Sequence, residues 1–216
     1  MGRPAKYLYA LRFRALDRIY DPVARWTTRE RRIKGLLVAQ VAAGEGRALD
    51  IGCGTATLLL LLRARYSQAP LVGFDGDRRM LAIARRKLQA AGATVALVEG
   101  LAGTLPFAAA SFDRVVSSLA FHHFNRETKR RALAEIRRVL RPGGELHVAD
   151  WGRPQNLLMR AAFLGVQLLD GFATTASSVR GELVGMMAAA GLVDVAETCR
   201  EWTMFGTMSL YRARRP

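Results

Sequence analysis

The feature that most constrains this chain is a short apolar run that ends in two glycines and continues into an apolar helix. Residues 47–51 are typical of a buried strand, Gly52 and Gly54 follow it, and residues 57–66 are typical of a helix. Glycine has no Cβ, so a Gly-x-Gly loop at a strand end lets the backbone approach a ligand closely. The segment predicts a strand–loop–helix unit, although the glycine pair alone also fits a plain turn.

Apolar strand-like runs and amphipathic helical runs alternate through most of the chain. This alternation predicts a parallel sheet with helices on both faces. The last two strand-like runs have no helix between them, which indicates an antiparallel pair. The predicted fold is therefore α/β, a Rossmann-like, doubly wound, mostly parallel sheet with an antiparallel C-terminal hairpin. The expected strands are 47–51, 71–74, 94–98, 114–118, 145–149, 193–199 and 203–211, and the expected helices are 57–66, 77–91, 127–140 and 182–190.

The length of 216 residues suits one domain with a sizeable core. We expect a single domain over residues 1–216, in which residues 1–44 form an N-terminal helical cap and residues 45–150 form the ligand-binding core. Residues 151–180 would form a lid over the site, and residues 181–216 the last helix and the hairpin.

The composition is typical of a protein of the cytoplasm. Cys53 and Cys199 lie far apart and fit neither a disulfide framework nor a zinc site. No run reaches the roughly 20 apolar residues that a membrane-spanning helix requires. The arginine-studded N-terminus also lacks the apolar core of a signal peptide. We expect no metal site.

A second candidate ligand-binding residue lies at the end of the next predicted strand. Asp75 ends the next strand, 21 residues beyond Gly54, where a carboxylate can accept hydrogen bonds from both ribose hydroxyls of an adenosine. Helix capping is the alternative for this acid, and Asp77 competes for that role. A dinucleotide would want a third glycine for its pyrophosphate, whereas the run here continues to Thr57 without one. The two signals favour S-adenosylmethionine, which has no phosphate, over NAD.

Four longer segments now carry a family resemblance. The segments ALDIGCGTA, VGFDGDRRMLAIARRK, LPFAAASFDRVVSSLAFHHF and EIRRVLRPGGELHVAD resemble the ordered motifs of class I S-adenosylmethionine-dependent methyltransferases. The resemblance covers about residues 45–150, and the ending FGTMSLYRARRP is similar to the final strand of the ubiquinone/menaquinone C-methyltransferase group. It implies an enzyme that transfers the methyl group of S-adenosylmethionine to a small, apolar, quinone-like or lipid-like acceptor and releases S-adenosylhomocysteine.

The resemblance also implies which residues hold the cofactor, from its methionine part through its ribose and adenine to its methyl group. These residues are Asp50, Gly52, Cys53 and Gly54 for the methionine part, Asp75 for the ribose, Gly76, Leu101 and Ala102 for the adenine, and Ser118 for the methyl group. Two positions depart from the family pattern. Ala56 replaces a third glycine, a small change, and Leu101 replaces an Asp or Asn that bonds the adenine amine. Backbone groups would then make that contact.

Two adjacent histidines, His122 and His123, follow the fourth predicted strand, where the methyl group would point. A neutral imidazole can take a proton near pH 7, so either histidine is a candidate general base. In an extended backbone the two side chains would face opposite ways, so one is expected to be structural. The alternative is that both only shape the pocket. His147 lies inside a predicted strand and is expected to be a core or surface histidine.

The acceptor would be enclosed by the segments outside the core. We expect substrate contacts from Tyr20 and Trp26 before the first strand, Trp151 after the fifth, and Phe163 in the lid. Residues 157–172 are almost wholly apolar, which fits either a lid for an apolar acceptor or a helix that only packs on the domain. As a lid, this segment could also face an anionic membrane surface.

The net charge of +15 leaves several partners open. Ten of the first 34 residues are Arg or Lys, which fits peripheral contact with an anionic membrane, a nucleic-acid acceptor, or simply a solvated surface. Base-amino methylation usually requires an Asn/Asp-Pro-Pro-aromatic motif after the fourth strand, and this chain has SSLAFHH there. This difference disfavours a nucleic-acid methyltransferase, which is kept as an alternative because of the charge. A non-catalytic S-adenosylmethionine-binding regulator is the other alternative. The sequence leaves the oligomeric state open.

Overall fold

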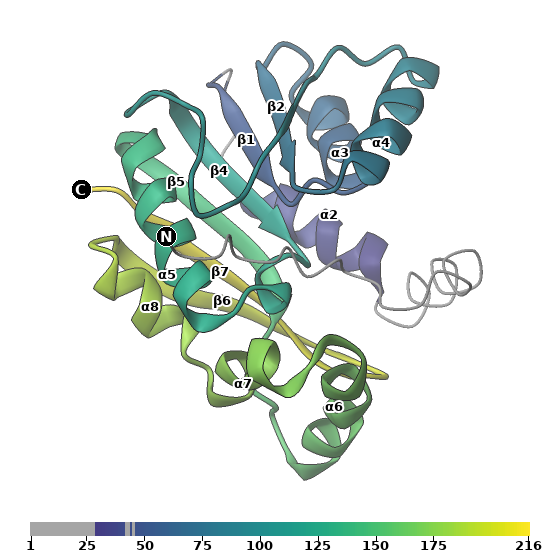
Figure 1. Ribbon diagram of the computed structural model, residues 1–216, viewed down its shortest axis with the longest axis vertical. Helices are drawn as coiled ribbons and strands as arrows, with labels where there is room; N and C mark the ends of the chain where they lie inside the picture. Colours follow the sequence, from purple (N-terminus) through teal and green to yellow (C-terminus); the bar gives the residue numbers. More distant parts are fainter. Residues whose placement is uncertain (1–28, 42–43, 45) are drawn as a thin grey trace, which may run out of the picture.

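The computed structural model describes residues 29–41, 44 and 46–216. One seven-stranded sheet forms its centre, with the strand order β3-β2-β1-β4-β5-β7-β6 (Figure 1). The first five strands run parallel to one another. They are β1 (Ala48–Ile51), β2 (Leu71–Asp75), β3 (Ala96–Glu99), β4 (Phe112–Ser118) and β5 (Leu140–Trp151). Their carboxyl ends therefore meet at one edge of the sheet, where open α/β sheets bind ligands.

The last two strands close the other side of the sheet as an antiparallel hairpin. β6 (Val193–Thr203) pairs with β7 (Gly206–Arg214), and β7 inserts between β6 and β5. This arrangement confirms the predicted fold class, a mostly parallel Rossmann-like sheet with an antiparallel C-terminal hairpin. β6 continues past its predicted end at residue 199 to Thr203, whereas β7 begins at Gly206 instead of residue 203 and continues past residue 211 to Arg214.

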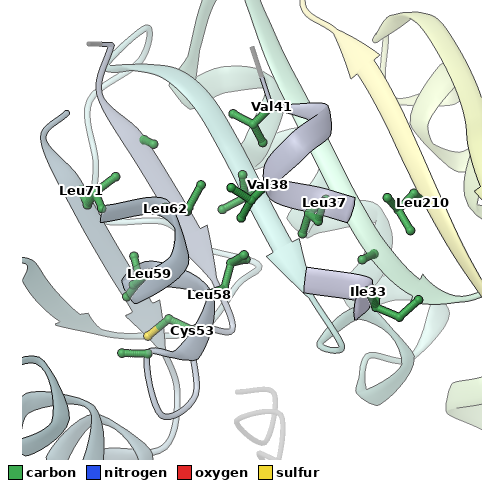
Figure 2. Close-up of a cluster of buried hydrophobic side chains, with 14 of the residues drawn as sticks. Ile33, Leu37, Val38, Val41, Cys53, Leu58, Leu59, Leu62, Leu71 and Leu210 are labelled. Atoms are coloured by element: carbon green, nitrogen blue, oxygen red, sulfur yellow. The ribbon is translucent and has the colours of Figure 1, made fainter. Parts of the chain in front are cut away.

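Helices cover both faces of the sheet, and each face has its own buried cluster. On one face, side chains of α2 (Glu30–Gln40), α3 (Thr57–Arg65) and α4 (Arg78–Ala90) pack against Ala48, Leu71 and Val116 (Figure 2). On the other, α5 (Arg126–Val139) and α8 (Leu183–Ala189) pack against alternate strand residues such as Leu49 and Val115. Alternation along each strand sends neighbouring side chains to opposite faces, so the strands are buried on both sides.

Two further helices lie near the carboxyl ends of the parallel strands. α6 (Leu157–Asp170) packs on β7, and α7 (Phe172–Arg180) packs on η1, a single 3₁₀ turn at Phe121–His123 that follows β4 (Figure 1). Within the described part of the chain, each helix is too short or too polar to cross a lipid bilayer.

The segment around Pro142 differs most from its expected structure. The sequence predicts that Pro142, Gly143 and Gly144 stop a helix that reaches residue 140, and that a strand begins at residue 145. In the structure α5 ends at Val139, and all three residues lie within β5, which begins at Leu140. Gly143 has a φ of +77°, and the Gly143 amide donates to Arg215 O, so the early part of this strand is hydrogen-bonded to the residue that follows β7. Elsewhere the predicted elements differ from the observed ones by a few residues at their ends.

Candidate active site

Backbone hydrogen bonds hold the glycine loop after β1 against the end of β2. The amides of Gly52 and Cys53 both donate to Phe74 O on β2, at 2.8 and 3.1 Å, and Gly52 has a φ of +71°. A Cβ on Gly52 would lie 2.4 Å from Ala120 Cβ, so the loop after β1 directly touches the segment after β4. Gly54 also has a positive φ, +51°, but a Cβ there would meet nothing within 4 Å. Gly52 is therefore needed for packing, whereas Gly54 borders open space.

Ala56 completes the turn into α3 in an unusual conformation. It has a φ of +64° and is fully buried. For a residue with a Cβ the left-handed region costs roughly 1–2 kcal/mol. The departure from glycine is therefore accommodated by the fold, but with local strain that the sequence does not reveal.

Asp75 lies at the end of β2, beside the glycine loop. One of its carboxylate oxygens accepts from the Gly54 amide at 2.8 Å, and the other accepts from the Asp77 amide at 2.8 Å. Burial raises the pKa of Asp75, although these backbone hydrogen bonds oppose the rise. Asp77 caps α4 by accepting from the Arg79 amide, as its position predicts. Asp75 thus fixes the glycine loop to β2 from the ligand-binding edge of the sheet.

Two other predicted cofactor residues have buried polar atoms without partners. Both carboxylate oxygens of Asp50 and the hydroxyl of Ser118 are buried, and no hydrogen bond reaches them from the described residues. Burial raises the pKa of Asp50 to about 7, although nearby Lys34 opposes the rise. Buried polar atoms are almost always paired in folded proteins. These unpaired groups on β1 and β4 are therefore suited to bind the polar part of a ligand at this edge.

The remaining predicted cofactor residues surround the loop with different exposures. Gly76 is half-buried and follows Asp75, Cys53 and Ala102 are buried, and Leu101 is 48% exposed. Burial raises the pKa of the Cys53 thiol far above its usual range, so this cysteine is not a reactive thiolate. Leu101 and Ala102 follow β3, next to the end of β2, as the sequence predicts.

His122 and His123 lie together in η1, directly after the segment that contacts the glycine loop. Their rings are 3.9 Å apart between centroids. The backbone here is a 3₁₀ turn rather than extended, so the two side chains do not point to opposite sides. The extended backbone that would send the two side chains to opposite faces is therefore not present here. His147, by contrast, is a fully buried histidine in β5, bonded to Gln40 and Glu145.

Asp150, near the end of β5, organises this turn. His122 Nδ1 donates to Asp150 Oδ1 at 2.7 Å, and the Trp151 amide donates to the same oxygen at 2.7 Å. The other oxygen accepts from the amides of Phe121 at 2.7 Å and His122 at 3.3 Å. With four hydrogen bonds, Asp150 fixes both the backbone of η1 and the orientation of the His122 ring.

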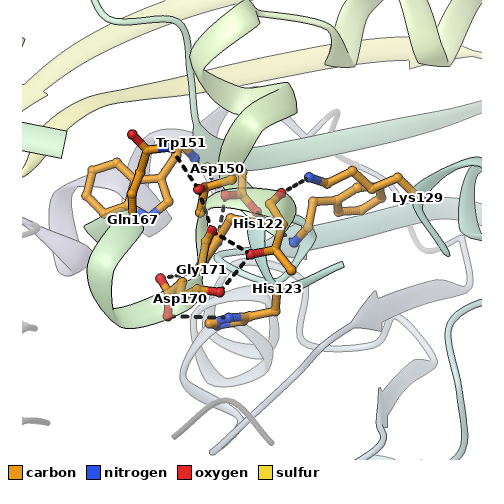
Figure 3. Close-up of polar contacts among 11 residues, drawn as sticks. His122, His123, Lys129, Asp150, Trp151, Gln167, Asp170 and Gly171 are labelled. Atoms are coloured by element: carbon orange, nitrogen blue, oxygen red, sulfur yellow. Dashed lines mark hydrogen bonds and ion pairs between the residues drawn. The ribbon is translucent and has the colours of Figure 1, made fainter. Parts of the chain in front are cut away.

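A second carboxylate approaches the same histidines from the opposite side. Asp170, the last residue of α6, places Oδ2 3.7 Å from His122 Nε2 and Oδ1 3.8 Å from His123 Nδ1 (Figure 3). The His122 side chain is 5% exposed and that of His123 is 28% exposed. His123 is therefore the member of the pair that an acceptor could reach.

The four groups differ in their preferred protonation states. Burial opposes a charge on His122, but Asp150 and Asp170 together raise the pKa of His122. Burial also opposes a charge on Asp150, yet the attraction of His122 keeps its pKa below the usual range. Burial and the neighbouring His122 lower the pKa of His123. The arrangement favours a charged His122 between two carboxyl groups and a neutral His123, whose ring can accept a proton but is a weak base while His122 carries its charge.

The predicted substrate residues are only partly brought to this site. Trp151 is buried, with its ring 6.5 Å from that of His122 and 5.3 Å from that of Phe163. Phe163 is 1% exposed and packs behind Trp151. Both thus lie beside the histidine pair. Tyr20 and Trp26 lie outside the described residues.

Two carboxylates of the site, Asp150 and Asp170, were not predicted from the sequence. Each has a signal in the sequence that could have revealed it. Asp150 directly follows a predicted strand, as Asp75 does, and Asp170 is the one acid in the apolar stretch 157–172. Their common contact with His122 could not be predicted from the sequence, because the two aspartates are 20 residues apart and lie on different elements, β5 and α6.

Known proteins share both the sequence motifs and this fold. A family model described as a methyltransferase domain matches residues 48–144. The chain is 33% identical over 184 residues to the ubiquinone/menaquinone biosynthesis C-methyltransferase of Syntrophotalea carbinolica, covering 77% of each protein. It is 44% identical over 108 residues to the demethylmenaquinone methyltransferase of Thermus thermophilus, covering 50% of this chain and 48% of that protein. A crystal structure of a putative methyltransferase from Bacillus halodurans superimposes with a TM-score of 0.68 at 19% identity, covering 85% of this chain and 98% of that one.

The chain therefore belongs to the class I S-adenosylmethionine-dependent methyltransferases and is similar to the ubiquinone/menaquinone C-methyltransferase group. It is an enzyme, and S-adenosylmethionine is its cofactor. The residues present fit that molecule. The unpaired Asp50 carboxylate suits an ammonium group, and the open space beside Gly54 leaves room for a ligand along the backbone.

Proposed function

We propose that this enzyme methylates a small, apolar, quinone-like acceptor, and that the histidine pair in η1 lies beside the transferred methyl group. The single observation that carries the mechanism is the position of η1: it follows Ala120, which contacts the glycine loop, and it presents His123 on its more exposed side. The names of the similar proteins, which methylate ubiquinone and menaquinone precursors, support the acceptor class.

We propose the following roles for the cofactor residues. Asp50 binds the amino group of the methionine part, and the glycine loop lies along it. The Asp75 carboxylate accepts from the ribose through lone pairs that its two backbone hydrogen bonds leave free. Gly76, Leu101 and Ala102 flank the adenine.

The proposed chemistry requires little from the protein beyond alignment and one proton transfer. When bound, S-adenosylmethionine supplies a methyl group that is already activated on a sulfonium. The chain has to orient the acceptor, exclude water and remove a hydroxyl proton. His123 is suited to the last task, because its neutral ring is accessible. His122 is suited to a supporting role, because it is buried and its Nδ1 is committed to Asp150.

We further propose that α6 and α7 act as a lid with an apolar outer surface. Five leucines of α6 are exposed, as is Phe172 at the start of α7. The most exposed are Leu157 at 87% and Leu168 at 74%, and the hairpin tip adds Trp202 and Met204. Together with the charge of +15, this surface suits peripheral contact with an anionic bilayer that contains the acceptor.

The cofactor and acceptor proposals are tested together. Purified protein is titrated calorimetrically with S-adenosylmethionine, S-adenosylhomocysteine and NADH, and the Asp75→Ala variant is titrated in parallel. We expect micromolar binding of the first two ligands, weaker binding in the variant, and none for NADH. A reduced demethylmenaquinone analogue should then yield a product that carries one additional methyl group. Turnover with RNA but not with the quinol would contradict the proposal.

The membrane proposal is tested separately by liposome flotation. Vesicles with anionic lipid should carry the protein at low salt and release it at high salt. Flotation that is absent at low salt would contradict it without affecting the proposed reaction.

A further inference from the structure

Asp170 is the single acidic residue of α6 and α7. It lies at the end of α6, where the chain turns into α7. Burial raises the pKa of Asp170, and its side chain is 12% exposed. An acid in such a place is costly unless a neighbouring group offsets its desolvation. The two histidines of η1 are the cationic or proton-carrying groups that its oxygens approach.

The corner that holds Asp170 is firmly built. Gly171 has a φ of +97°, and the hydroxyl of Thr174 donates back to Asp170 O at 2.7 Å. The hydroxyl of Thr175 donates to Gly171 O at 2.7 Å and accepts from the side-chain Nε2 of Gln167 at 3.2 Å. These contacts fix the angle between α6 and α7, and with it the backbone from which the Asp170 carboxylate reaches η1.

A buried lysine ties this corner to the rest of the molecule. Lys129, on α5, donates to Thr174 O at 2.7 Å and to the hydroxyl of Ser177 at 2.6 Å (Figure 3). Lys129 is 2% exposed, and a buried ammonium with two acceptors is a strong anchor. The α6–α7 corner is thereby fixed against the element that follows η1.

We propose that Asp170 is the positioning carboxylate for the histidine pair: it bridges His122 Nε2 and His123 Nδ1, fixes the protonated state of the first and the tautomer of the second, and thereby directs His123 Nε2 toward the acceptor. The active base is then assembled only when the α6–α7 corner is docked on η1. This inference rests on the proposed function and adds to it the residue that makes one of the two histidines a base.

Asp150 cannot take this role, although it is nearer to His122. Its two oxygens already accept four hydrogen bonds, three from Phe121 and His122 of η1 and one from the Trp151 amide of β5. The charged and titratable groups that face the histidines are Asp150 from β5, Asp170 from α6 and Lys129 from α5. Asp170 is the one of these groups that approaches both rings. Its distances of 3.7 and 3.8 Å are long for hydrogen bonds, and such contacts often shorten when a ligand binds.

The proton balance of the step is simple. The hydroxyl proton of the acceptor would move to His123 Nε2, and the ring carbon that shares the resulting negative charge would form the bond to the methyl carbon. That ring carbon would then lose its own proton to solvent as the ring becomes aromatic again. The bond between the methyl carbon and sulfur breaks, and sulfur keeps the electron pair and becomes a neutral thioether. His123 becomes an imidazolium whose Nδ1–H points at the Asp170 carboxylate, which stabilises the new charge.

The chain offers an unusually clean test that does not depend on activity. It contains three histidines, so the imidazole nitrogens of His122, His123 and His147 can all be followed by NMR as pH is varied, with EDTA present. In Asp170→Asn the pKa of His122 should fall, because Asp170 raises it in the wild type. His147, which pairs with Glu145, should not change, and Asp194→Asn on the exposed hairpin serves as the matched control. Unchanged titration of both site histidines would overturn the proposal.

Kinetics then tests the link to catalysis. Asp170→Asn should lower kcat by at least about 10-fold, the lower part of the range for a lost acid–base contribution, while the KM for the acceptor and the Kd for S-adenosylmethionine change little. The pH dependence of kcat should shift with the His122 pKa. Asp170→Glu, which keeps the charge, should recover part of kcat. A kcat profile in Asp170→Asn that matches the wild type would overturn the proposal, whereas a wild type that binds S-adenosylmethionine but never methylates a quinol would contradict the proposed function alone.

Discussion

Two buried aspartates on β1 and β5, the parallel strands on either side of β4, behave in opposite ways. Asp150 on β5 accepts four hydrogen bonds and its pKa lies below the usual range, whereas Asp50 on β1 has no partner among the described residues and its pKa is raised to about 7. The first belongs to the half of the site that would hold the acceptor, and the second to the half that would hold the cofactor. In the acceptor half the protein itself supplies the hydrogen-bond partners of the buried carboxylate. In the cofactor half those partners are left for a ligand to supply.

The largest effect is expected at Asp150. Asp150→Asn removes the charge that faces buried His122 and leaves backbone amides without their full partner, which should cost about 4 kcal/mol of stability. Urea unfolding at pH 7 measures this loss. Asp194→Asn, at an exposed ion pair on the hairpin, is the control and should change stability by less than about 0.5 kcal/mol. A similarly small effect for Asp150→Asn would show that the hydrogen bonds of Asp150 do not stabilise the fold.

The glycine loop offers the next comparison. Gly52→Ala places a Cβ 2.4 Å from Ala120 Cβ in a left-handed conformation, which should cost about 3 kcal/mol. Gly54→Ala meets no atom within 4 Å and should cost only about 1 kcal/mol, yet weaken S-adenosylmethionine binding because the new methyl group enters the ligand space. Thermal unfolding and calorimetric titration separate the two effects. If Gly54→Ala binds as tightly as the wild type, the ligand does not lie along this loop.

Asp50→Asn should act in the opposite direction to Asp150→Asn. Because the folded state raises the pKa of Asp50, its protonated form is favoured by folding, and the associated stability is present below pH 4 and lost as pH rises to about 7. Asn resembles the protonated form, so the variant should be about 2 kcal/mol more stable than the wild type at pH 8 and similar at pH 4. Urea unfolding at both pH values measures this difference. A variant that is destabilised at pH 8 would mean that Lys34 or another group already compensates the charge.

The smallest effect on stability is expected on the exposed face of α6. Leu168→Ser alters a side chain that is 74% exposed, so unfolding should change by less than about 0.5 kcal/mol. Flotation with anionic vesicles should nevertheless decrease. Ile83→Ser, at an exposed position on α4, is the matched control and should float as the wild type does. Equal flotation of all three proteins would exclude this face as the contact surface.

The comparison also explains which features could be predicted from the sequence. Most of the cofactor half is built by a continuous segment whose strand, glycines and helix follow one another, so its chemistry is visible as a local pattern ending at Asp75. The acceptor half is built from His122, Asp150 and Asp170, which come from three elements and meet only in the folded sheet. Their contact depends on the order of β4 and β5 and on the angle at Gly171, and no local pattern encodes either. The left-handed conformation of Ala56 could not be predicted either, because an alanine gives no local signal for a positive φ.

The location of Asp170 has a consequence for how such enzymes diversify. The same 14-residue helix carries the outward leucines and ends in the carboxylate that reaches the histidines. Under our proposal, a relative that acquired a different α6 by insertion or recombination would change its choice of acceptor and its proton chemistry in one event. New acceptors could then arise by exchange of this module, while the glycine loop and its cofactor chemistry stayed as they were.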